Sequence, residues 1–273
     1  MIRNGLVLEG GALRGLFTCG VLDVLMEQGV TAFSGMIGVS AGAAFGCNMK
    51  SRQPGRVLRY NKRFAHDWRY CSLRSLLTTG DLFGAFCYHE LPNNLDVFDA
   101  DTFAANPMEF WLVCTDVRTG QAVYKQLSHI DYEAEEWFRA SASMPLVSHP
   151  VPIGDRLLLD GGMTDSIPLE RFERMGYGRN VVVLTQPQGF VKQPNRAVPL
   201  MRLLLRRYPA VARAMACRHE MYNRQLSYVA QAESEGRALV IRPKSKLPIG
   251  HVCHDEQVMQ HTYDLGQIGR AHV

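Results

Sequence analysis

Two apolar segments near the start of the chain each lead through a glycine-containing turn into a helix-like segment. In the first unit, residues 6–8 precede such a turn and a helical pattern at residues 16–28. In the second, residues 36–39 precede Ser40 and a small, apolar segment at residues 41–49. Strand, turn and helix repeated in this order are typical of a parallel sheet with helices on both faces. We therefore expect a three-layer α/β/α fold with a mostly parallel central sheet.

Later segments continue this pattern. Residues 181–184 lack polar alternation, so we expect a strand that is buried on both faces. After Thr185, prolines and glycines mark a loop, and the helical segments that follow break at Pro209. Residues 187–273 are therefore expected to form a helical C-terminal extension packed on the same domain. The other expected elements are strands at 110–115, 122–126, 156–160 and 238–241, and helices near 56–64, at 131–142 and from about 255.

The composition is that of an ordinary globular protein. Hydrophobic residues make up 47% of the 273 positions and charged residues 21%, which is a usual balance. No segment approaches the run of about 18 apolar residues that a membrane-spanning helix requires, and the N-terminus lacks the features of a signal peptide. The seven cysteines contain no C-x-x-C pair, which suits free thiols in a reducing compartment. These features predict a cytoplasmic protein.

Positive charge is concentrated in one part of the chain. Residues 192–224 contain eight lysines and arginines and one acidic residue, a local charge of +7, whereas the whole chain carries +4. Such a surface suits anionic partners such as phosphate head groups, and we expect no nucleic-acid partner.

Residues 200–207 within this basic segment are both apolar and basic. One interpretation is docking on an anionic membrane surface, which would place the protein at the inner face of the membrane. The other is a helix packed on the sheet with its arginines in water. Because apolar residues nearly surround the helix, we favour the buried helix.

The pentapeptide Gly38-Val39-Ser40-Ala41-Gly42 separates an expected strand from an expected helix. A serine on a sharp strand-to-helix turn needs small residues two positions to either side, because larger ones would collide. The turn lifts the hydroxyl clear of the sheet, where it can act as a nucleophile. An ordinary tight turn is the alternative, but the strand before it and the small-residue helix after it favour a serine hydrolase with Ser40 as nucleophile.

The first glycine turn, Glu9-Gly10-Gly11-Ala12-Leu13-Arg14-Gly15, suits an anion. Its backbone N–H groups can approach a negative charge closely, and the following helix contributes its positive N-terminal end. An oxyanion hole with Arg14 beside it is one interpretation. A dinucleotide-binding turn fits poorly, since Ala12 stands at the second glycine position and the next strand does not end in a carboxylate. No Lys-Ser/Thr follows, so a phosphate-binding P-loop is disfavoured as well.

The third turn, Asp160-Gly161-Gly162, follows the expected strand at 156–160. Turns at the carboxyl ends of parallel strands lie along one edge of a sheet, so Asp160 is expected to reach Ser40. A Ser-His-Asp triad would also need a histidine. None of the candidates stands at a strand-end turn, and a two-residue mechanism with Asp160 as the base is the alternative, in which burial would raise a pKa that is otherwise near 4. The candidates are His129, His149, His219, His251, His254, His261 and His272.

A short cluster of His251, Cys253 and His254 suggests half of a metal site. A closed zinc site needs about four ligands at suitable spacing, and the sequence offers no second pair. We therefore expect no metal.

The three turns, in this order, resemble those of the patatin-like phospholipase family, and the chain is most similar to its small bacterial members. The resemblance covers about residues 5–185 and rests on Gly10–Gly15, Gly38–Gly42 and Asp160–Gly162. A fourth block, Ala140-Ser141-Ala142-Ser143-Met144-Pro145, resembles the family's segment upstream of the acid. The resemblance implies a catalytic domain at residues 1–186.

The resemblance also assigns roles to these motifs. It implies Ser40 as the nucleophile and Asp160 as its base. The N–H groups of Gly10, Gly11 and Ala12 would form the oxyanion hole, supported by Arg14. The motif glycines are Gly15, Gly38, Gly42, Gly161 and Gly162, and the family needs neither a metal nor an organic cofactor.

Two residues depart from the family pattern. Ala12 replaces a usual glycine, which demands an ordinary φ angle there. Glu9 stands beside the anion site, where Asp or Gly is commoner.

The function expected from these features is acyl-ester hydrolysis. The substrates would be phospholipids, lysophospholipids or related lipid esters, cleaved through a Ser-Asp dyad. Two alternatives stay open. One is a conventional Ser-His-Asp esterase of small soluble esters, and the other is a lipid-binding protein without activity.

Overall fold

The computed structural model describes residues 2–268, whose strands form one eight-stranded sheet. The strand order is β5-β6-β3-β2-β1-β7-β8, and β4 pairs with β3 outside this path. Strands β1, β2, β3, β7 and β8 pair in parallel, whereas β4, β5 and β6 join through antiparallel pairs. The expected mostly parallel sheet is thus confirmed. The strands are β1 (Arg3–Leu8), β2 (Gly35–Val39), β3 (Glu109–Asp116), β4 (Ala122–Leu127), β5 (Val151–Ile153), β6 (Arg156–Asp160), β7 (Tyr177–Val183) and β8 (Ala238–Ile241).

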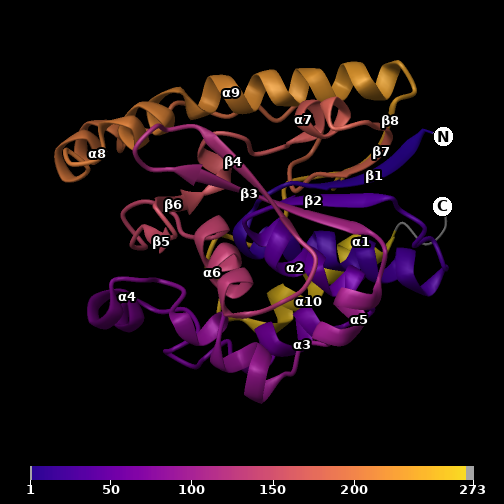
Figure 1. The fold of residues 1–273 in the computed structure, drawn as a ribbon, viewed down its shortest axis with the longest axis horizontal. Helices are drawn as coiled ribbons and strands as arrows, with labels where there is room; N and C mark the ends of the chain where they lie inside the picture. Colours follow the sequence, from indigo (N-terminus) through magenta and orange to yellow (C-terminus); the bar gives the residue numbers. More distant parts are fainter. Residues whose placement is uncertain (1, 269–273) are drawn as a thin grey trace.

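Helices cover both faces of the sheet, so the α/β/α layering is confirmed. Figure 1 shows α7 and α9 above the sheet and α1, α2 and α10 below it. The α-helices are α1 (Gly15–Glu27), α2 (Ala41–Lys50), α3 (Arg56–Arg63), α4 (Leu73–Thr79), α5 (Ala100–Ala105), α6 (Tyr132–Ser141), α7 (Leu169–Arg174), α8 (Val198–Leu204), α9 (Pro209–Ser234) and α10 (Glu256–Gln267). No helix among the described residues is long and apolar enough to cross a membrane.

The central strands bury side chains on both faces, as their unbroken apolar runs predict. In β7, Val182 packs toward the α7 and α9 side with Phe172 and Tyr222. Its neighbour Val183 packs on the opposite side with residues such as Leu16 of α1. Because adjacent side chains of a strand point to opposite faces, one strand contributes to two separate cores.

The C-terminal part of the chain is integrated into both helical layers. Strand β8 extends the sheet by pairing in parallel with β7. Helix α10 begins after Asp255, whose side chain accepts the N–H groups of Gln257 and Val258, a regular N-cap. On the other side of the sheet from α9, α10 packs against α1, and the Tyr263 hydroxyl donates to Asp23 over 2.5 Å.

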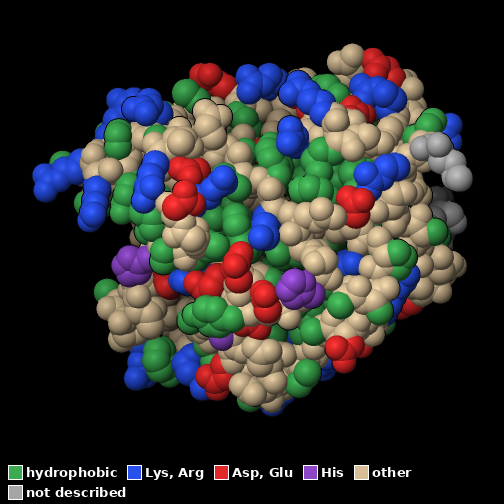
Figure 2. Space-filling view, in the orientation of Figure 1, with side chains coloured by type: hydrophobic (Ala, Val, Ile, Leu, Met, Phe, Trp, Pro, Cys, Tyr) green, Lys and Arg blue, Asp and Glu red, His purple; other side chains and the backbone are tan. Residues whose placement is uncertain are grey.

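The expected burial of the apolar and basic helix is wrong. The side chains of α8 at Leu200, Leu203 and Leu204 are 52%, 66% and 59% exposed, and Met201 is the buried one at 7%. The helix has only seven residues and projects at the end of the long α9 (Figure 1). Too few neighbours reach it to cover all of its faces. Lys and Arg side chains gather at this same end of the molecule (Figure 2).

Candidate active site

Ser40 occupies a strained turn between β2 and α2. Its backbone has φ 55° and ψ −124°, a region that non-glycine residues rarely adopt. The turn runs close to the end of β1, since a Cβ atom on Gly42 would lie 2.6 Å from the Leu8 carbonyl oxygen. Only glycine fits at that position, which explains the small-residue pattern around Ser40. The Ser40 side chain is half-buried and lines a cavity.

Two serines of the Ala140–Pro145 block support this turn and Asp160. The Ser40 N–H donates to the Ser141 hydroxyl over 3.0 Å, and that hydroxyl donates to the Val113 carbonyl oxygen over 2.7 Å. The carbonyl oxygen of Ser143 accepts the Asp160 N–H at 2.8 Å. The sequence pointed to this block only by resemblance, because nothing in its local pattern reveals these long-range contacts.

Asp160 reaches Ser40 by a route that the sequence did not predict. Strand β6 runs antiparallel to β3, so it approaches the carboxyl end of β2 from the opposite direction. Val39 pairs with Val113 and Asp160 pairs with Cys114, while β4 occupies the opposite edge of β3. Strands β2 and β6 therefore lie on the same edge of β3 and meet end to end. The expectation that a parallel strand carries Asp160 is wrong, although its place beside Ser40 is as expected.

The carboxylate of Asp160 is under opposing influences. The residue is 2% exposed, and burial raises its pKa above the ordinary aspartate value. A hydrogen bond from the Ser40 hydroxyl, a second from the Gly162 N–H at 2.7 Å and the charge of Arg218 each lower the pKa without cancelling that rise. A carboxylate bonded to a serine hydroxyl is placed to accept its proton.

The first glycine turn lies against the serine turn. A Cβ atom on Gly10 would be 3.2 Å from the Ser40 Cβ atom and 2.9 Å from the Val39 carbonyl oxygen. Within residues 2–268, the N–H groups of Gly10 and Gly11 donate to no protein acceptor. Gly10 therefore has a free N–H group next to the serine turn, and Gly11 follows it in the chain; free donors near a serine hydroxyl are what an oxyanion site requires.

The prediction of an ordinary φ angle at Ala12 is wrong. Its φ is +48°, the left-handed conformation that a glycine would adopt more easily, at a penalty of roughly 1–2 kcal/mol for other residues. Ala12 is the first residue of the short helix Ala12–Arg14, which the turn enters directly. Ala12 therefore has the backbone conformation that a glycine at this position would adopt more easily.

Glu9 is fixed away from the serine turn by two hydrogen bonds. It is fully buried, and its two carboxylate oxygens accept the Thr185 N–H and the Tyr222 hydroxyl, each at 2.5 Å. Burial raises the pKa of Glu9, and these hydrogen bonds lower it in part. The residue thereby joins β1 to α9.

A cavity of about 780 Å³ opens beside Ser40. Its size lies within the range of roughly 300–1,000 Å³ usual for ligand sites. Its walls are largely apolar and aromatic, and many come from residues 56–98, a segment for which the sequence predicted little. The abundance of aromatic residues there was the available signal. The lining from this segment includes Tyr60, Tyr70, Phe83, Leu91 and Phe98.

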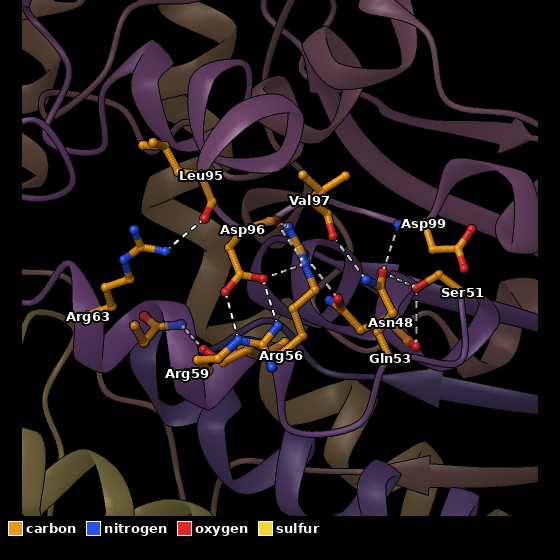
Figure 3. A network of polar contacts seen from close by, with 12 residues as sticks. Asn48, Ser51, Gln53, Arg56, Arg59, Arg63, Leu95, Asp96, Val97 and Asp99 are labelled. Atoms are coloured by element: carbon orange, nitrogen blue, oxygen red, sulfur yellow. Dashed lines mark hydrogen bonds and ion pairs between the residues drawn. The ribbon is translucent and has the colours of Figure 1, made fainter.

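An ion-pair network around the buried side chains of Arg56 and Asp96 holds that segment in place. Figure 3 shows Arg56 and Arg59 of α3 converging on Asp96. Arg59 makes two parallel bonds of 2.8 Å to the carboxylate, while Arg56 Nε lies 3.1 Å from it. Arg56 also donates to Asn48 of α2 over 3.0 Å. The network thus ties the cavity wall to the helix that starts at Ser40.

His251 lines the same cavity but pairs with Arg14. Its Nε2 atom lies 3.3 Å from Arg14 Nη1. Desolvation by the surrounding protein and the positive charges of Arg14, Arg218 and Lys192 lower the pKa of His251 to about 4. The neutral ring therefore accepts a hydrogen bond from Arg14. No contact joins it to Ser40 or Asp160 among the described residues.

The cluster His251, Cys253 and His254 is not brought together. His254 Nδ1 lies 2.5 Å from the Ala65 carbonyl oxygen, and Cys253 contacts the Asp255 carbonyl oxygen. Across residues 2–268, no group of three or more His, Cys, Asp or Glu side chains is arranged to hold a metal ion. The candidate His272 lies outside the described residues.

Comparison with known proteins agrees with the fold and the motifs. The family model of the patatin-like phospholipases matches residues 6–172, and a model described as a domain of unknown function matches residues 208–271. The uncharacterised protein YjjU of Escherichia coli is 28% identical over 70% of this chain and 54% of its own length. The lysophospholipase NTE1 of Candida glabrata is 28% identical over 63% of this chain and 10% of its own.

The chain thus spans about half of the bacterial relative and a tenth of the fungal one. Among solved structures, VipD from Legionella pneumophila aligns with a TM-score of 0.41 and 11% identity, over 98% of this chain and 67% of VipD. The family model covers more than half of the chain and includes the serine turn and Asp160. The chain belongs to the patatin-like phospholipase family.

Proposed function

We propose that the protein hydrolyses acyl esters of lipids through a dyad of Ser40 and Asp160. The observation that carries the proposal is the hydrogen bond between the Ser40 hydroxyl and the buried Asp160 carboxylate, beside a large apolar cavity. The serine supplies a nucleophile, the carboxylate a base, and the cavity a place for an acyl chain.

The reaction follows from the positions of these groups. The Ser40 Oγ attacks the ester carbonyl carbon while Asp160 accepts the hydroxyl proton. The N–H groups of Gly10, Gly11 and Ala12, with the charge of Arg14, stabilise the oxyanion of the tetrahedral intermediate. Asp160 then protonates the leaving alcohol, and an acyl-enzyme forms on Ser40. Water, deprotonated by Asp160, releases the fatty acid and restores the serine.

The substrates are phospholipids, lysophospholipids or related esters. Membership of the phospholipase family and the lysophospholipase activity in the name of the Candida glabrata relative support this class. The catalytic groups belong to the proposed catalytic domain, residues 1–186, and the described part of the proposed C-terminal extension, residues 187–268, packs on it.

We also propose that α8 brings the enzyme to an anionic membrane surface at the cytoplasmic face. Its exposed Leu200, Leu203 and Leu204 suit insertion among acyl chains, and the nearby Arg202, Arg206 and Arg207 suit anionic head groups. Met201 of the same helix lines the cavity, so a docked α8 lies beside the path of a lipid.

Two rival functions make different predictions. A Ser-His-Asp esterase would need a histidine near Ser40, and the low pKa and Arg14 contact of His251 disfavour it. A lipid-binding protein without activity would not need the hydrogen bond between Ser40 and Asp160. Variant kinetics separate these functions from the dyad.

The test is hydrolysis of a long-chain lysophospholipid by purified variants. We expect Ser40→Ala and Asp160→Asn each to lose at least about a thousandfold in kcat, the scale of losing a nucleophile or base. Asp155→Asn, an exposed acid in the same β-hairpin, is the matched control and should retain activity. Loss of activity in His251→Gln as complete as in Ser40→Ala would contradict the dyad and favour the Ser-His-Asp esterase.

A further inference from the structure

Three cationic side chains gather beside the candidate active site without an ion-pair partner. Arg14, Lys192 and Arg218 are each half-buried and close enough for their charges to act on one another. In the part of the chain that the structure describes, none of the three lies within 4.0 Å of a carboxylate oxygen. Clustered cations that are partly removed from water are unfavourable unless an anion joins them.

The two nearby carboxylates do not neutralise this cluster. Glu9 uses its oxygens to accept from Thr185 and Tyr222, and Asp160 accepts from Ser40 and Gly162. Even with both acids ionised, three positive charges face two negative ones. The site therefore keeps an excess of positive charge.

A second cavity, of about 370 Å³, lies against two of these cations, Lys192 and Arg218. Lys192 and His219 line it, and its wall of Asn195, Met215 and Arg218 also lines the larger apolar cavity that holds Ser40. Arg218 therefore lies between the larger, mainly apolar cavity and the smaller, more polar cavity. Among residues 2–268, neither the buried Nδ1 atom of His219 nor the buried Nε atom of Arg14 has a hydrogen-bond partner.

The backbone and side chain of Lys192 are held in position. Its N–H donates to the Asn223 side chain over 2.8 Å, and its carbonyl oxygen accepts from the same side chain at 3.0 Å. Its ammonium group lies 4.8 Å from the centre of the Tyr222 ring. Partial burial and the charges of Arg218 and Arg14 lower the pKa of Lys192 to about 8. A bound anion would stabilise this charged form.

We propose that Lys192 and Arg218 form a subsite for the phosphate group in the head of the lipid substrate, with the acyl chain in the apolar cavity. The inference rests on the proposed function and extends it, because it assigns the leaving-group side of the ester to the smaller cavity. Arg and Lys are the usual partners of phosphate oxygens. Phosphate-bearing lipids are then preferred to neutral acylglycerols with the same acyl chain.

The test compares two substrates with one acyl chain, a lysophosphatidic acid and a monoacylglycerol. The measured quantity is the ratio of their kcat/KM values. We expect Lys192→Met to lower this ratio by about tenfold or more, as expected for a lost charge-assisted hydrogen bond, and Lys192→Arg to restore much of it. Lys246→Met, at an exposed lysine of the C-terminal segment, is the matched control and should leave the ratio unchanged.

A binding measurement keeps the test independent of turnover. We expect sn-glycerol 3-phosphate, and not glycerol, to bind the Ser40→Ala protein by calorimetry and to inhibit the wild type competitively. Adding Lys192→Met should weaken this binding. An unchanged substrate ratio in Lys192→Met, or no binding of glycerol 3-phosphate at millimolar concentration, overturns the subsite. A wild-type protein that hydrolyses neither lipid but binds glycerol 3-phosphate contradicts the proposed function and leaves the subsite supported.

Discussion

Asp160 illustrates how one residue's surroundings suit it to a task. Burial raises its pKa, which makes the carboxylate a stronger base than an exposed aspartate. Ser40, Gly162 and Arg218 counter part of that rise and keep the charged form accessible. A base works best when its pKa approaches the working pH without exceeding it. The pKa of Asp160 therefore depends on the balance between burial, the two hydrogen bonds and the Arg218 charge.

Removal of that charge should move the acid limb of the pH profile. In Arg218→Met, the pKa of Asp160 rises further, because a cation that stabilised the carboxylate is gone. The proposed mechanism requires the ionised carboxylate, so activity is lost as the pH falls through this pKa. In the variant, that loss begins at a higher pH than in the wild type. The measurement is kcat/KM against pH on a neutral acyl ester. The control is Arg213→Met, at an exposed arginine of α9. If the acid limb of the Arg218→Met profile is unmoved or lies at lower pH than in the wild type, the account is contradicted.

Local sterics explain which single residues could be predicted. The small residues around Ser40 follow from the turn itself, because Gly42 touches the β1 backbone. The positive φ of Ala12 could not be predicted, since it runs against the residue's own conformational preference. Lys192 and Arg218 were recognised only as part of a basic segment. Their places beside Ser40 depend on contacts between distant parts of the chain.

Helix α8 shows that sequence alone is also insufficient to predict the surroundings of a whole helix. Its apolar residues predicted burial, but a sequence pattern does not reveal whether another element covers each face. The helix is short and lies beyond the sheet, so three of its leucines stay exposed. Strand β6 is comparable. Its residues were predicted correctly, whereas its antiparallel direction depends on pairing with β5 and β3.

Exposed leucines in α8 should govern binding to membranes. We expect the double variant Leu203→Ser and Leu204→Ser to bind vesicles containing anionic phosphatidylglycerol at least about tenfold more weakly, since burying one leucine is worth about 1.5–3 kcal/mol. The measurement is vesicle co-sedimentation. The control is Leu73→Ser with Leu77→Ser, two exposed leucines of α4. Equal binding by both double variants contradicts docking through α8.

At the scale of the molecule, the candidate site is assembled from both ends of the chain. Residues before 187 supply the serine, the acid and the glycine turns, and these could be predicted because each lies in a compact local motif. The later segment supplies Lys192 and Arg218 and contributes β8 and α10 to the fold. The sequence predicted that this segment packs on the domain. It could not show which of its side chains reach the site, because α9 crosses the whole sheet (Figure 1).

The central claim is that Ser40 is a nucleophile activated by Asp160. A fluorophosphonate that reacts with activated serines tests it most directly, with the modified residue identified by mass spectrometry of peptides and the labelling rate measured in each variant. The account predicts one modified residue, Ser40, no labelling in Ser40→Ala, and labelling of folded Asp160→Asn slowed by about a hundredfold or more, the contribution of a positioned base. Labelling at another residue, or Asp160→Asn labelled at the wild-type rate, would contradict it.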